Sequence, residues 1–122
     1  MAQINKHEFG MQGQLEAEKF LRSKGYDILK RNFRTQAGEI DLIARHNEYV
    51  VFVEVKYRFG VSHGYPRESV GRAKQRRIVK TALYYIAENQ LDNQDFRFDV
   101  VEVLGGSGKV VINHIENAFD AW

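Results

Sequence analysis

Two carboxylates and a lysine stand inside otherwise apolar stretches of the segment from 38 to 58. Asp41 lies among isoleucine, leucine and alanine, while Glu54 and Lys56 follow a β-branched run. Residues two apart on a strand share a face, so Glu54 and Lys56 point to the same side. Charged side chains are seldom buried without a partner or a metal. These three residues are therefore the first candidates for chemistry.

The strand register decides whether the acids meet. The alternating pattern predicts two strands joined by a short turn at 47–48. With an even-numbered loop centred there, the numbers of opposed residues sum to 95, which sets Asp41 against Glu54 and Glu39 against Lys56. Directly opposed Cβ atoms lie roughly 4.5–5.5 Å apart, close enough for two carboxylates to share one cation. An odd-length loop would move every side chain to the other face.

Two interpretations of this hairpin are open. Lys56 could neutralise Glu54 or Glu39 in a structural ion pair, a type of contact that is often worth less than ~1 kcal/mol when exposed. Alternatively, Asp41 and Glu54, with the Val55 carbonyl and waters, could hold Mg²⁺ or Mn²⁺. Such a metal polarises a phosphodiester and lowers the pKa of a bound water, which Lys56 could orient or deprotonate. Spacing alone slightly favours the ion pair.

Composition restricts the class of protein. The 122 residues, 43% hydrophobic and 12% aromatic, predict one folded domain spanning 1–122. The absence of cysteine excludes disulfides, zinc-finger spacing and a thiol nucleophile. The longest wholly apolar run, 50–53, is far too short to span a membrane, and residues 1–10 lack the apolar core of a secretory signal. A cytoplasmic protein without membrane association is the simplest expectation.

Basic residues cluster downstream of the hairpin. Eight of the eighteen lysines and arginines fall between 56 and 80, against the single acid Glu68. The cluster could bind a nucleic-acid backbone, or it could be a solvated helix face, and charge alone does not separate these readings. We take as candidate nucleic-acid contacts Arg58, Arg72, Lys74, Gln75, Arg76 and Arg77.

Periodicity predicts an order of helix, three strands, helix and two strands. The first helix covers 10–24 and ends at Gly25, and a strand follows at 26–33. After the hairpin, Ser69 is the predicted N-cap of a helix over 70–89. Strands at 96–104 and 109–115 close the chain around a glycine-rich turn, with an irregular tail at 116–122. The apolar stripe of the second helix is predicted to be Val79, Ala82, Leu83 and Ile86. This order predicts an α+β or α/β sheet with helical cover.

The hairpin motif resembles a known family. Gly38-Glu39-Ile40-Asp41-Leu42-Ile43-Ala44, followed by Val51-Phe52-Val53-Glu54-Val55-Lys56 and Arg58, is similar to the YraN family of small bacterial proteins. The likeness covers almost the whole chain. It extends to Gly25-Tyr26, Arg31-Asn32, Gly64, Pro66, Val70, Lys74-Gln75, Arg77, Phe98-Asp99-Val100-Val101 and His114-Ile115-Glu116-Asn117-Ala118-Phe119.

The resemblance implies a function as well as a fold. Members are predicted endonucleases of the PD-(D/E)XK superfamily, similar to archaeal Holliday-junction resolvases. This implies a restriction-endonuclease-like core with a mixed five-stranded sheet flanked by helices, and Mg²⁺- or Mn²⁺-dependent hydrolysis of DNA, including branched DNA, by a homodimer. Asp41 and Glu54 would bind the metal, Lys56 would be the catalytic lysine, and Glu39 an accompanying acid. The alternative is a non-catalytic nucleic-acid-binding protein on the same fold.

One position departs from the family pattern. The family usually carries a glutamate in the first helix three residues before the alanine that is Ala17 here, and this chain has Gln14. Glu16 is a poor substitute because it is rotated about 200° away from Gln14 on the helical wheel, whereas Glu18, one turn on from Gln14, is a possible one. An amide oxygen can bind a metal but brings no charge, so we expect weaker metal binding than a glutamate would give.

Overall fold

Five strands and two helices make up the described part of the chain. The computed structural model describes residues 6–59, 70–106 and 108–121. The elements are α1 Lys6–Ser23, β1 Asp27–Thr35, β2 Gly38–His46, β3 Tyr49–Phe59, α2 Arg72–Glu88, β4 Asp95–Gly106 and β5 Lys109–Phe119. The predicted α+β class and the order α-β-β-β-α-β-β are confirmed.

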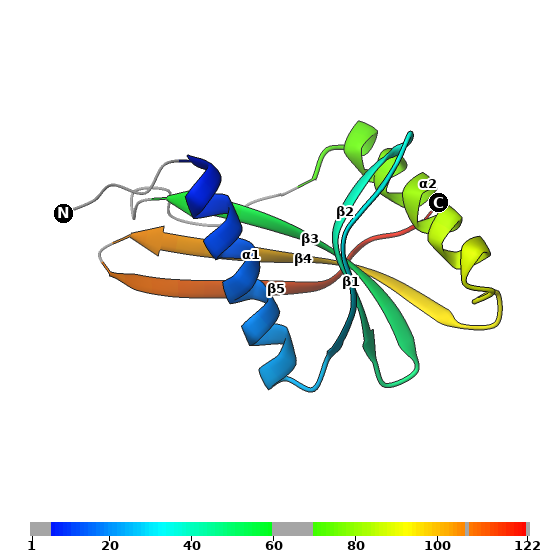
Figure 1. The fold of residues 1–122 in the computed structure, drawn as a ribbon, viewed down its shortest axis with the longest axis horizontal. Helices are drawn as coiled ribbons and strands as arrows, with labels where there is room; N and C mark the ends of the chain where they lie inside the picture. Colours follow the sequence, from blue (N-terminus) through cyan, green and yellow to red (C-terminus); the bar gives the residue numbers. More distant parts are fainter. Residues whose placement is uncertain (1–5, 60–69, 107, 122) are drawn as a thin grey trace.

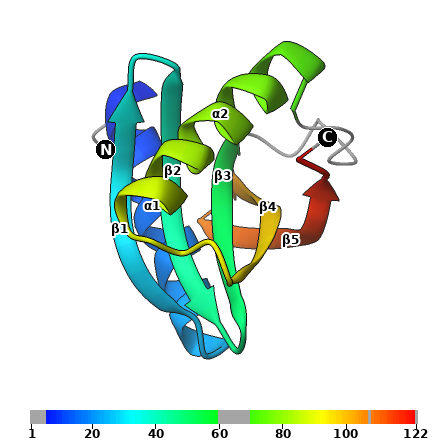
Figure 2. The same cartoon turned by 90° about the vertical axis from the view of Figure 1, so that its right-hand side faces the viewer.

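The strands form one mixed sheet in the order β1-β2-β3-β4-β5. Every neighbouring pair is antiparallel except β3 and β4, which run parallel. The helix α2 is the crossover between them, and it brings the chain back to the end of the sheet at which β3 began. The helices lie on opposite faces: Figure 2 shows α2 crossing in front of β2 and β3, and Figure 1 shows α1 across the other side of the sheet. No helix among the described residues is long and apolar enough to cross a membrane.

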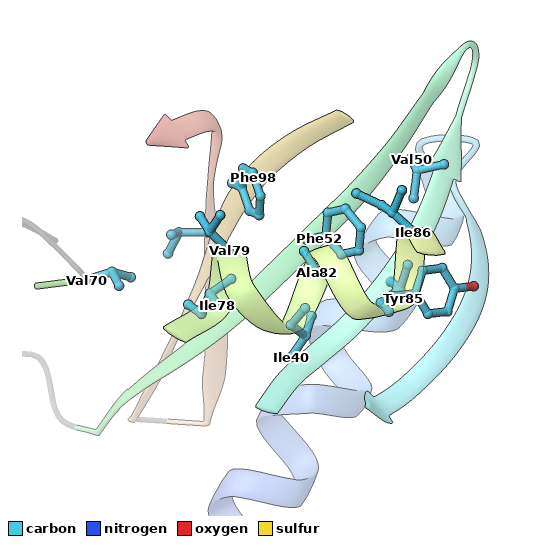
Figure 3. Close-up of a cluster of buried hydrophobic side chains, with 12 residues drawn as sticks. Ile40, Val50, Phe52, Val70, Ile78, Val79, Ala82, Tyr85, Ile86 and Phe98 are labelled. Carbon is cyan, nitrogen blue, oxygen red and sulfur yellow. The ribbon is translucent and has the colours of Figure 1, made fainter. Parts of the chain in front are cut away.

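Each face of the sheet carries its own core. On the α2 side, Phe52 of β3 and Phe98 of β4 pack with Tyr85 and Ala82 of the helix (Figure 3). On the α1 side, the alternate residues of the same strands pack beneath the helix around Leu21 and Tyr26. The central strands are thus apolar on both faces, as expected for strands covered by helices on both sides.

The predicted register of the central hairpin is confirmed between residues 42 and 53. Asn47 and Glu48 form a two-residue turn, with Asn47 at φ 56°, a conformation that asparagine tolerates. Pairing runs from His46 opposite Tyr49 to Leu42 opposite Val53, so that the numbers sum to 95 throughout.

Two details of α2 differ from the prediction. Gly71 is the N-cap residue and makes no side-chain capping bond, whereas the predicted cap, Ser69, lies outside the described residues. Leu83 was wrongly assigned to the apolar stripe, since 47% of it is exposed. The buried face is rotated toward Ile78 and Tyr85, because the helix packs obliquely across the strands.

The C-terminal tail was predicted to be irregular, and this was wrong for most of it. β5 continues to Phe119, with a register shift against β4 and a left-handed residue, Asn117 at φ 54°. Phe119 stacks on Phe98 with ring centroids 5.1 Å apart. Residues 116–119 lack strict alternation because this irregularity interrupts it, which is why the sequence pattern missed the strand.

Candidate active site

The site begins at a break in the alternation of β2. Ile40 packs into the α2-side core and Leu42 into the α1-side core, although residues two apart normally share a face. Asp41 lies between them. On β1, Asn32 adopts φ 51° between the residues that pair with Ile40 and Leu42. Both strands therefore turn over at this point, and the turn directs Asp41 away from either core.

Asp41 continues the hairpin where the backbone ladder stops. Beyond Leu42 and Val53, the carboxylate Oδ2 of Asp41 accepts a 2.8 Å hydrogen bond from the N–H of Val55. The ladder does not include the predicted pair of Asp41 with Glu54, but both residues line one cavity. The ladder ends before the predicted pairing of Glu39 with Lys56, and so that pairing is not formed.

The cavity has a volume of about 310 Å³ and lies between the hairpin and the first turns of α2. It is lined by Gly38, Glu39, Asp41, Glu54, Val55, Tyr57, Lys74, Arg77 and Ile78. Three carboxylates thus converge with one lysine and one arginine from the helix. A larger cavity of about 490 Å³ lies at the other end of α2, against β4 and β5, but contains none of these acids. We place the candidate site in the smaller cavity because the chemistry is there.

The three acids of the cavity outnumber the two cations that line it. Burial, with repulsion from Glu54 and then Glu39, raises the pKa of Asp41 to about 7, against the opposing effect of the Val55 bond. Burial also raises the pKa of Tyr57 to about 12, and Asp41 adds to the rise. Both shifts indicate a pocket that disfavours further negative charge and in which a cation would be stabilised.

A lysine does neutralise Glu54, but it is Lys74 and not the predicted Lys56. The Nζ of Lys74 lies 2.5 Å from Oε2 of Glu54, whose side chain is only 6% exposed. The expected ion pair of Glu54 or Glu39 with Lys56 is replaced by this contact from α2. Lys56 is half-buried on β3 and lies outside the cavity lining.

Gln14 reaches the acids only indirectly. Its side-chain amide exchanges hydrogen bonds of 3.0 and 3.3 Å with Asn32, and Asn32 donates to Glu39 at 3.1 Å. Arg34 also lies 3.3 Å from Glu39. Gln14 is therefore one residue removed from the cavity, whose lining does not include it.

Glu18 does not replace the missing glutamate. Arg22 and Arg31 both bind its carboxylate, and the bond from Arg31 is the main cause that holds the pKa of Glu18 below its usual value. This buried acid ties α1 to β1 and is not part of the carboxylate cavity.

Two glycines allow the walls of the cavity to close. A Cβ on Gly13 of α1 would clash with the ring of Tyr57, so the ring would have to move. A Cβ on Gly38 would lie 3.3 Å from Cβ of Arg77. The close approaches of α1 and α2 to the hairpin thus depend on the missing side chains.

The predicted nucleic-acid contacts divide into three groups. Lys74 and Arg77 line the cavity, and Arg72 and Arg76 are exposed on α2. The other two are engaged within the protein: Nε of Arg58 lies 3.7 Å from the buried carboxylate of Glu102, and Gln75 donates a 2.8 Å bond to the carbonyl of Val70. The structure thus brings only part of the predicted set to the site.

A second group of buried polar residues escaped the sequence interpretation. Asp99 of β4 binds Arg97, His114 and the N–H of Asn117. The signal that could have found it is an aspartate in the apolar run 96–104. The side chain of His114 is only 3% exposed.

The described residues contain no group of three or more His, Cys, Asp or Glu side chains that could hold a metal ion by themselves. The available donors are the carboxylates of Asp41 and Glu54 with the Val55 carbonyl, supplemented by water. Hard oxygen ligands of this kind suit Mg²⁺ or Mn²⁺. A cation would reduce the repulsion from Glu54 and Glu39 that helps raise the pKa of Asp41.

Comparison with known proteins identifies the family. A family model described as "Uncharacterised protein family UPF0102" matches residues 14–103. The chain belongs to this family. A UPF0102 protein of Syntrophotalea carbinolica is 48% identical over 91% of this chain and 90% of its own length, and one of Lachnoclostridium phytofermentans is 48% identical over 98% of both.

UPF0102 is the family that the hairpin motif resembled, under its name YraN, so that resemblance is confirmed. A solved structure, "Crystal structure of SSO0001", has a TM-score of 0.39 and 15% identity, and covers 92% of this chain and 52% of that chain. At this score the likeness supports no conclusion about the chain.

Proposed function

We propose that the chain is a metal-dependent endonuclease that hydrolyses DNA phosphodiester bonds, with branched or junction DNA as the first substrate class to test. The supporting observation is the convergence of Glu39, Asp41 and Glu54 on one cavity beside two cations of α2. A carboxylate set short of positive charge, next to basic groups that could meet a phosphate, suits metal-dependent hydrolysis of a phosphodiester.

In this proposal Asp41 and Glu54 hold Mg²⁺ or Mn²⁺ with the Val55 carbonyl. The ion supplies polarisation of the phosphodiester and a lower pKa for a bound water. The Val55 N–H fixes one oxygen of Asp41 at 2.8 Å and leaves the other available. Glu39, held by Asn32 and Arg34, adds negative potential at the cavity edge.

The basic residues are assigned by whether they line the cavity, share a strand face with Glu54 or are exposed on α2. Lys56 shares its strand face with Glu54 and is proposed to act on the attacking water from the margin of the cavity. Arg77 lines the cavity, where it could neutralise charge on the phosphate. Arg72 and Arg76, exposed on α2, are proposed to bind the DNA backbone. Cutting both strands of a junction takes two sites, and so the proposal includes a homodimer.

One observation favours a second candidate function. Lys74 already neutralises Glu54, and a permanent ion pair would close the cavity to metal. The chain would then bind nucleic acid through α2 without cutting it. Metal-dependent cleavage separates the two functions, because both predict binding that weakens steeply with salt.

The test incubates purified protein with linear, flapped, nicked and four-way DNA in Mg²⁺ or Mn²⁺. We expect cleavage by the wild type and a loss of about 100-fold or more in Asp41→Ala and Glu54→Ala. Asp92→Ala, which removes an exposed acid outside the carboxylate cavity, is the matched control and should cleave normally. Equal cleavage by all four proteins would mean contamination and would remove the support for this function.

A further inference from the structure

The contact of Lys74 with Glu54 has no local explanation in α2. Lys74 is the third residue of the helix, and the first turn contains no acid. A cation there opposes the helix dipole, which favours negative charge at this end. The cost is offset only by the carboxylate that the lysine reaches on β3, 2.5 Å from its Nζ.

The two partners differ in freedom. The Glu54 side chain is 6% exposed and fixed on the central strand, whereas that of Lys74 is 45% exposed. A lysine side chain is long and flexible, and so its ammonium can leave the carboxylate without disturbing the helix. Lys74 also lines the cavity that contains Asp41, so its ammonium lies near both acids.

A divalent ion and this ammonium compete for Glu54. Lys74 already contacts Oε2 of its carboxylate, and two cations sharing one carboxylate repel each other. We propose that Lys74 is an exchangeable counter-ion: it neutralises Glu54 while no metal is bound, leaves when a divalent cation enters between Asp41 and Glu54, and then neutralises the substrate phosphate. This inference rests on the proposed metal site.

Arg77 does not serve the same purpose. It lines the same cavity from the next turn of α2, but its Cβ lies against Gly38 at the mouth of the hairpin. A guanidinium is also planar and always charged, and it is better suited to bind phosphate with two bonds than to exchange with an ion. Lys74 is therefore the residue whose removal should open the carboxylates.

The test measures Mn²⁺ binding by titration calorimetry and does not depend on cleavage. Lys74→Met should bind Mn²⁺ more tightly than wild type, by roughly 5- to 150-fold, the range typical of coupling between two ligands. Lys80→Met removes the same charge from an exposed position of α2 outside the cavity and should leave the Kd unchanged. Lys74→Gln, which keeps a polar head, should behave as Lys74→Met, and circular dichroism checks that each variant is folded.

A second measurement follows the released lysine. With Ca²⁺ in place of Mg²⁺, Lys74→Met should bind four-way DNA several-fold more weakly than Lys80→Met, because the ammonium is missing from the phosphate. The counter-ion role is overturned if both Lys74 variants bind Mn²⁺ no more tightly than the wild type. If the wild type still binds Mn²⁺ and Asp41→Ala does not, the proposed nuclease stays intact. No Mn²⁺ binding by any folded protein overturns the metal site and this inference together.

Discussion

Asp41 on β2 and Asp99 on β4 are both carboxylates inside one sheet, but they are held in opposite ways. Burial by itself raises the pKa of Asp99, yet bonds from His114, Arg97 and Asn117 outweigh it and hold that pKa below its usual value. Asp41 has one backbone donor and two acidic neighbours, and its pKa rises to about 7. The fully satisfied acid is fully buried, and the under-satisfied one lines a cavity.

The difference separates a structural polar cluster from a candidate reactive one. Arg97 binds both oxygens of Asp99 at 2.9 Å and the hydroxyl of Tyr26 at 2.6 Å. This network joins the start of β1 to β4 and β5 and leaves Asp99 no free oxygen. In the cavity the acids keep unused oxygens and repel each other, an arrangement that is typical of functional sites.

The largest effect should follow from breaking the satisfied cluster. Asp99→Ala leaves Arg97 partly buried without its carboxylate, and removing one partner of a buried ion pair typically costs about 3–5 kcal/mol. We expect a loss of this order in the free energy of unfolding, measured by urea denaturation at pH 7. Glu116→Ala, which removes an exposed acid 3.8 Å from the same arginine, is the control and should change stability by less than about 1 kcal/mol. Equal losses in both variants would show that Asp99 is not the anchor of the cluster.

A smaller effect with a distinctive pH dependence is expected at Asp41. Because its folded-state pKa lies above the ordinary value of 3.8, the protein binds this proton more tightly when folded, and stability falls as pH rises from about 4 through about 7. Asp41→Asn keeps an oxygen for the Val55 N–H but cannot ionise. It should be more stable than wild type at pH 8, by on the order of 1–3 kcal/mol, and equally stable near pH 4.

The contribution of Asp99 to stability should change with pH in the opposite direction to that of Asp41, so the two aspartates together test the comparison. Its lowered pKa contributes stability above the unfolded-state value that is lost as the pH falls. Thermal melts of wild type, Asp41→Asn and Asp99→Asn from pH 3 to 8 check both. If Asp41→Asn has the same stability as the wild type at every pH, the cavity does not raise the pKa of Asp41 and the contrast between the two acids is wrong.

The hairpin was predictable and its partners were not. The register of Leu42 with Val53 followed from alternation and a two-residue turn, both of which are local properties of the sequence. The break at Asp41 needed the left-handed Asn32 on the neighbouring strand, and nothing in the spacing indicates it. Lys74 could be placed at Glu54 only once α2 was packed on the sheet, since twenty residues separate the two.

The errors in α2 and β5 also arise because tertiary packing is not visible in the local sequence pattern. The helical period identified an amphipathic helix, but its direction across β2 and β3 decides that Tyr85 is buried and Leu83 exposed. Phe119 joins the core through its stacking on Phe98, a contact across β4 and β5 that overrides the irregular local pattern. Tertiary packing decided each case in which the local pattern failed.

The smallest expected effect is at Gln14, where the family usually has a glutamate. Gln14→Glu adds a carboxylate next to Asn32, which already donates a hydrogen bond to Glu39. The change also removes the 3.0 Å hydrogen bond that the Gln14 amide donates to Asn32. Because Gln14 reaches the cavity only through Asn32, the added charge should be screened at the protein surface. We expect Mn²⁺ affinity to rise by no more than about fivefold, the lower end of the range for coupled sites. Glu16→Gln, on the same helix, is the control, and a gain above tenfold in Gln14→Glu alone would mean that Asn32 gives way and this helix position contacts the metal directly.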